Sequence, residues 1–64
     1  MTHEKAIALL QDRVDKLVYE SNTLNWAIIG AGTTSERGIG YIEERRVIDE
    51  EVNDLRLAIS ELSG

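Results

Sequence analysis

Two stripes of mainly apolar residues, separated by a glycine-rich segment, limit the ways in which this chain can fold. Within each stripe the residues are alternately three and four positions apart, which is the heptad spacing of packed helices. The first stripe contains Ile7, Leu10, Val14, Leu17, Ser21, Leu24 and Ile28, and the second contains Tyr41, Arg45, Ile48, Val52, Leu55, Ile59 and Leu62. Because no proline interrupts either stripe, the sequence predicts two helices, at about residues 3–30 and 36–62.

The two stripes pair along their whole length if the helices are antiparallel. Ile28 then lies opposite Tyr41 and Ile7 opposite Leu62, and each stripe residue between them faces one residue of the other stripe. The midpoint of this pairing falls inside the glycine-rich segment, where a turn is needed. We therefore expect an all-α protein in which residues 1–64 form a single antiparallel helical hairpin.

The glycine-rich segment contains residues suited to ending one helix and starting another. We expect the turn at about residues 31–35. Either Gly30 or Gly32 can adopt the left-handed conformation that ends a helix. Thr33 followed by Glu36 fits a capping box at the start of the next helix.

Small residues beside the turn allow the two helices to converge. Ala31 and Gly38 face each other in the hairpin register, and neither has a side chain large enough to hold the helices apart. Gly38 and Gly40 also weaken the start of the second helix, by about 1 kcal/mol each relative to alanine.

The size of the chain favours association with a partner subunit. A chain of 64 residues buries only about 60% of the surface that its unfolded form exposes. Natural domains of this size add disulfides, a metal or a second subunit. The chain has no cysteine, and His3 is its single imidazole, so disulfides are impossible and a structural zinc site is close to excluded. We therefore expect a homo-oligomer, with a dimer favoured.

An apolar patch outside the stripes supports the same expectation. It comprises Val18, Tyr19, Trp26, Ile29 and Ile42. Two-stranded coiled coils keep their outward positions polar, so this patch needs a cover. We expect a second hairpin to cover it, which would give a four-helix bundle dimer. The alternatives are a different protein anchored on Trp26 and simple exposure of scattered apolar side chains.

Two stripe positions are polar: Ser21, which faces Ile48, and Arg45, which faces Leu24. One interpretation is that they specify the register, with Arg45 extending along the edge of the seam. The other is that Arg45 reaches a carboxylate of a partner chain or an anionic ligand, because a charge in a seam is costly unless it is paired.

The turn also carries groups that an anion would favour. Thr33, Thr34 and Ser35 supply hydroxyls beside a helix N-terminus, Arg37 supplies a positive charge, and Arg45 is a further candidate. The sequence is therefore compatible with binding of an anionic small ligand such as a nucleotide. A plain hairpin turn explains the same residues, and the context does not fit a dinucleotide-binding fold.

The charge of the chain restricts its partners and its location. A net charge of −5 argues against nucleic acid and anionic membranes as partners. Asp49, Glu50 and Glu51, with Asp54, form an acidic patch that we interpret as a solvated face or, alternatively, as a mimic of nucleic-acid phosphates. No apolar run, including that of residues 26–29, approaches the roughly 18 residues of a membrane span. With no recognisable leader segment, we expect a cytoplasmic protein without membrane attachment.

No arrangement of residues typical of an enzyme is recognisable. The single histidine lies near the N-terminus, and the carboxylates lie on faces that we expect to be exposed. Motifs for zinc, calcium and P-loop phosphate binding are absent. We therefore expect no catalytic activity, no cofactor and no metal.

The expected plan, a short acidic hairpin that dimerises, resembles that of Rop-type plasmid regulators in architecture and size only. We expect a non-catalytic protein that self-associates and binds another macromolecule as an adaptor or inhibitor, encoded by a phage or plasmid. The alternatives are an oligomeric protein that binds or sequesters an anionic small ligand and, with less support, an acidic mimic of nucleic acid.

Overall fold

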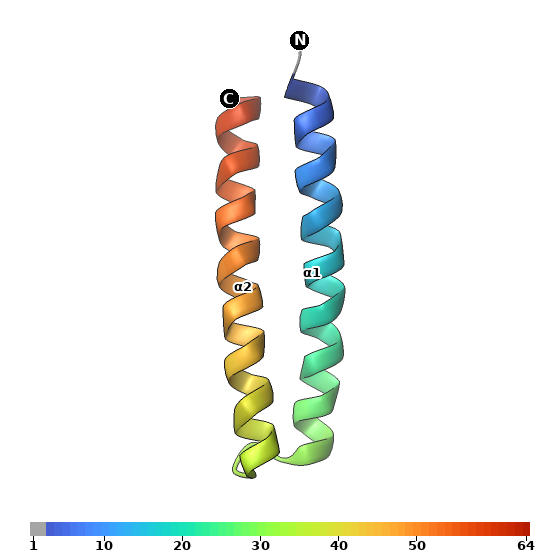
Figure 1. Ribbon diagram of the computed structural model, residues 1–64, viewed down its shortest axis with the longest axis vertical. Helices are drawn as coiled ribbons and strands as arrows, with labels where there is room; N and C mark the ends of the chain where they lie inside the picture. The colour runs from blue at the N-terminus through green and yellow to red at the C-terminus, as the bar shows by residue number, and fades with distance from the viewer. Residues whose placement is uncertain (1–2) are drawn as a thin grey trace.

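A computed structural model describes residues 3–64 as two long helices joined by a short turn. Helix α1 covers His3–Ala31 and helix α2 covers Glu36–Ser63. The helices lie side by side and antiparallel, so that the start of α1 and the end of α2 lie at the end of the rod opposite the turn (Figure 1). The rod measures 49 × 14 × 11 Å. The predicted all-α class is confirmed for the described residues, and the antiparallel arrangement is the one that a hairpin requires.

The hydrophobic core is a narrow strip between the helices. Its central cluster consists of Val14 and Leu17 of α1 and Val52 of α2, which are at most 7% exposed. Ile28 is buried separately, near the turn. The half-buried side chains that pack against the central cluster are Val18, Ile48, Leu55 and Ile59. All fourteen positions of the two apolar stripes are buried or half-buried.

The turn is closed by Gly32 and Ser35. Gly32 has a φ of 91°, and its N–H donates to the carbonyl oxygen of Ile28 at 2.8 Å, which ends α1. Ser35 is the N-cap of α2, because its hydroxyl oxygen accepts a hydrogen bond from the N–H of Gly38 at 3.0 Å. The same hydroxyl donates to the carbonyl oxygen of Gly32 at 3.1 Å. One serine side chain therefore joins the end of α1 to the start of α2.

The predicted capping box of Thr33 and Glu36 is wrong. Because α1 continues through Ala31, the chain has only four residues in which to reverse, and α2 begins at Glu36. Glu36 is thus the first helical residue, whereas a capping box needs a glutamate at the third. That third position is Gly38, which has no side chain to return the hydrogen bond.

Gly38 makes a close backbone contact with the turn. It is the one buried glycine among the described residues, and a Cβ atom built on it would overlap with the carbonyl oxygen of Gly32. The small residue at this position is therefore required by the turn.

Neither α1 nor α2 combines the length and the apolarity that crossing a lipid bilayer would require, within residues 3–64.

Candidate functional site

The predicted apolar patch is divided between two sides of the hairpin. Tyr19, Trp26 and Ile29 of α1 are 73%, 72% and 63% exposed. Val18, in contrast, is half-buried against the core cluster, and Ile42 is half-buried on α2. The structure therefore leaves Tyr19, Trp26 and Ile29 exposed and places Val18 and Ile42 nearer the seam.

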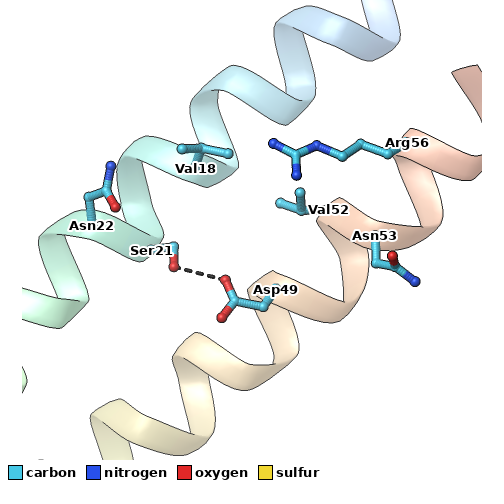
Figure 2. Close-up of a pocket in the computed structure, with 7 residues that line it drawn as sticks. All are labelled: Val18, Ser21, Asn22, Asp49, Val52, Asn53 and Arg56. Atoms are coloured by element: carbon cyan, nitrogen blue, oxygen red, sulfur yellow. Dashed lines mark hydrogen bonds between the residues drawn. The ribbon is translucent and has the colours of Figure 1, made fainter.

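A shallow groove runs between the helices on one side of the hairpin, with a volume of about 310 Å³. Its walls combine apolar and amide side chains with one acid and one arginine: Val18, Ser21, Asn22, Asp49, Val52, Asn53 and Arg56 (Figure 2). The guanidinium of Arg56 extends from α2 toward α1 beside Val52 (Figure 2). Three of these residues were not predicted as site residues from the sequence: Asn22, Asn53 and Arg56.

We call the side of the hairpin that contains this groove the groove face. It consists of the positions of both helices that flank the seam on that side, taken at the helical spacing of three and four residues. They are Glu4, Ala8, Gln11, Asp15, Val18, Asn22, Asn25 and Ile29 of α1 and Ile39, Ile42, Arg46, Asp49, Asn53, Arg56, Ser60 and Ser63 of α2.

The groove face differs in composition from the rest of the hairpin. It contains no lysine and a single glutamate, Glu4 at the end of α1 away from the turn, and its two aspartates are balanced by two arginines. The opposite face carries Glu20 and Glu44 beside a second hollow, together with the ion pair of Arg13 and Glu51. A count of Glu and Lys at the positions that flank each apolar stripe would have revealed this difference from the sequence.

The polar seam residues are hydrogen-bonded within the chain. The Ser21 hydroxyl donates to Asp49 Oδ1 at 2.8 Å, and Arg45 Nη1 donates to Asn25 Oδ1 at 2.9 Å. Arg45 Nε also lies 3.9 Å from Asp49 Oδ2. The bonds of Ser21 with Asp49 and of Arg45 with Asn25 bridge α1 and α2. They support the interpretation that Ser21 and Arg45 specify the register.

The groups proposed for anion binding at the turn are only partly available. Thr33, Thr34 and Arg37 are exposed. The Ser35 hydroxyl, however, already bonds to the backbone of Gly32 and Gly38. It therefore serves as the N-cap of α2 and is engaged within the turn. Arg45 lies more than two helical turns from Arg37 along α2 and is engaged with Asn25.

The acidic stretch of α2 does not form a uniform negative surface. Asp49 bonds to Ser21 and lies near Arg45, as described above. Glu50 Oε1 lies 3.9 Å from Arg46 Nε, and Glu51 Oε2 lies 3.3 Å from Arg13 Nη2. Arginine side chains are therefore interleaved with these carboxylates.

Residues 3–64 contain no group of three or more His, Cys, Asp or Glu side chains placed to hold a metal ion.

Four further large apolar side chains, not predicted as surface candidates from the sequence, are 48–66% exposed: Leu9, Ile39, Val47 and Leu57. Ile39 lies on the groove face, close to Ile42 along α2. Leu57 lies on the outer side of α2, and Leu9 and Val47 lie toward the opposite face.

Comparison of the chain with known protein families, with curated proteins and with solved structures found no match.

Proposed function

We propose that this chain is a non-catalytic binding protein, a helical hairpin that self-associates into a four-helix bundle dimer and binds another macromolecule as an adaptor or inhibitor. The observation that carries the proposal is the exposure of Tyr19 and Trp26, 73% and 72%, on the outer side of a long helix. Tryptophan and tyrosine are the side chains that most often anchor protein interfaces. A helix holds both rings in place, which lowers the entropic cost of docking.

The surface area of the hairpin supports self-association. Its solvent-accessible surface is 4976 Å². A folded monomer of 7.2 kDa is expected to expose about 4,100 Å². The excess of roughly 900 Å² is close to the roughly 800 Å² that each partner buries in a protein interface of standard size. A second hairpin would therefore bring the exposed area into the range of stable small proteins.

Site-specific photocrosslinking in cells that express the chain tests whether the aromatic rings contact a macromolecule. A photoreactive phenylalanine analogue would replace Trp26, and a matched control would carry it at Glu43, an outward position of α2. We expect one defined macromolecular adduct from position 26 and none from position 43. An equal pattern from both positions, or dimers of the chain alone, would remove the partner-binding assignment.

Binding of an anionic small ligand at the turn is a second candidate, motivated by the exposed Arg37, Thr33 and Thr34. The capping bonds of Ser35 make this candidate weaker than protein binding. A thermal-shift panel of nucleotides at millimolar concentration tests it, because a ligand that binds the folded state raises Tm. No increase in Tm would exclude the candidate.

Mimicry of nucleic acid by the acidic stretch has the least support, because arginines pair with three of its four carboxylates. A mimic would displace DNA or RNA from its binding protein with an affinity that falls as salt rises. Competition that ignores salt concentration would count against it.

A further inference from the structure

We propose that the groove face is the surface on which a second copy of this chain docks, with both turns at the same end of the bundle and each α1 lying against the α2 of the other copy. This inference deepens the proposed function and rests on its self-association. It specifies which face of the hairpin forms the dimer interface and which of the two bundle orientations is formed.

The composition of the groove face favours an interface over a solvated surface. Buried interfaces are depleted of lysine and glutamate and enriched in arginine. The groove face has no lysine and a single glutamate, Glu4 at the end of α1, whereas it has Arg46 and Arg56. The opposite face would bring Glu20, Glu44 and Glu51 of two copies together, and like charges buried at an interface are costly.

The heights of the groove-face residues along the rod favour the orientation in which both turns lie at the same end. The bond between Ser21 and Asp49 shows which parts of α1 and α2 are at equal height. Counting from it along the helices, Asp15 is level with Arg56, and Ile29 is level with Ile42.

A two-fold axis along the rod brings α1 of one copy against α2 of the other at equal heights. Asp15 then meets Arg56 of the partner subunit, and Ile29 meets Ile42 of the partner subunit. Each contact occurs twice because of the symmetry. Opposite charges meet between the middle of the rod and the end opposite the turns, and apolar side chains meet near the turns.

The opposite orientation, with the turns at different ends, matches these side chains poorly. A two-fold axis across the middle of the rod places α2 against α2. Asp49, near the middle of α2, then approaches Asp49 of the partner subunit, and Ile42 moves to the height of Arg56. Two aspartates would repel each other, and the isoleucines would lose their apolar neighbours.

Docking on the groove face leaves the rings of Tyr19 and Trp26 free. Tyr19 and Trp26 lie on the outer side of α1, so the dimer would present both rings of both copies to a further partner. Self-association and binding of another macromolecule therefore use different surfaces of the same helix.

Charge reversal combined with sedimentation equilibrium tests the face. We expect Asp15→Arg and Arg56→Asp each to weaken the dimer about tenfold or more, since each change creates two like-charge pairs. The double variant should restore most of the affinity. Asp54→Arg makes the same change of charge away from the groove face and is expected to leave the dimer intact. A dimer sensitive to Asp54→Arg and insensitive to Asp15→Arg would overturn the proposal.

Crosslinking of cysteine variants tests the orientation, because the natural chain has no cysteine. An equimolar mixture of Asp15→Cys and Arg56→Cys chains, treated with a short bis-maleimide, should give the mixed dimer as the main product. Dominant crosslinking of Asp49→Cys chains to themselves would show that the turns lie at different ends and would overturn the proposal.

The two proposals can fail separately. A natural chain that stays monomeric at every concentration would refute self-association and the docking face together. A dimer that forms but gives the Asp49→Cys product would refute only the orientation proposed here.

Discussion

Gly38 and Gly40 lie two residues apart in the first turns of α2, but their surroundings are opposite. A side chain on Gly38 would collide with the backbone of the turn at Gly32, whereas a Cβ on Gly40 would meet nothing within 4 Å. The first glycine is therefore required by tertiary packing, and the second only lowers the helix propensity of the segment.

We expect Gly38→Ala to lower the free energy of unfolding by about 2 kcal/mol, because the turn must shift to accept the methyl group. Gly40→Ala is the matched control and should raise the free energy of unfolding by about 1 kcal/mol, because alanine favours the helix. Urea unfolding followed by circular dichroism measures both. Equal effects of the two substitutions would contradict the close contact at Gly38.

Ser35 is the residue whose loss should loosen the turn most directly. Ser35→Ala removes the bonds to Gly38 and Gly32, so we expect a loss of about 1 kcal/mol in the free energy of unfolding. Thr33→Ala, which tests the capping box predicted from the sequence, should change it by less than about 0.5 kcal/mol. The same unfolding experiment distinguishes the two, and a larger effect at Thr33 would restore the capping box.

The helices associate through a strip of side chains only one or two residues wide. Leu17 is 3% exposed in the core cluster, whereas Leu57 is 57% exposed on the outer side of α2. Both residues are leucines within uninterrupted helices, so they differ in tertiary contacts far more than in local helix propensity.

Truncation of these two leucines should therefore have unequal effects. We expect Leu17→Ala to cost about 2–3 kcal/mol, because it removes buried methyl groups and leaves a gap between the helices. Leu57→Ala should change the free energy of unfolding by less than about 0.5 kcal/mol. Denaturant titrations of both variants at one chain concentration provide the comparison, and similar losses would indicate that Leu57 is covered in solution.

The whole hairpin is a thin rod, 49 Å long and 11 Å across its narrowest direction. Such a shape has much surface for its volume, which is why its exposed area exceeds that of a compact monomer of equal mass. Association of two rods side by side is the most direct way to reduce that area.

We expect the thermal stability of the chain to depend on its concentration. If folding is coupled to dimer formation, Tm should rise by several degrees over about a hundredfold increase in concentration. Calorimetry across that series, with light-scattering mass measured on the same samples, should give a rising Tm and a mass of two chains. A constant Tm with the mass of one chain would show that the hairpin is stable alone.

Helices, hairpin and core positions could be predicted from the sequence because they depend on periodicity. The spacing of the apolar stripes determines which face of each helix is buried, and their pairing determines that the helices are antiparallel. No comparable pattern marks the N-cap. Thr33 and Ser35 are both suitable caps, and the choice depends on where α1 ends, which the packing of Gly38 against Gly32 decides.

The candidate surfaces were predicted less well than the core for a related reason. The sequence by itself determined that Val18, Tyr19, Trp26, Ile29 and Ile42 lie outside the stripes. Only the tertiary structure decided which of them are exposed and which lie beside the seam, because this depends on the rotation of each helix about its axis and on the rotamers of its neighbours. The groove face likewise exists only once both helices are placed together.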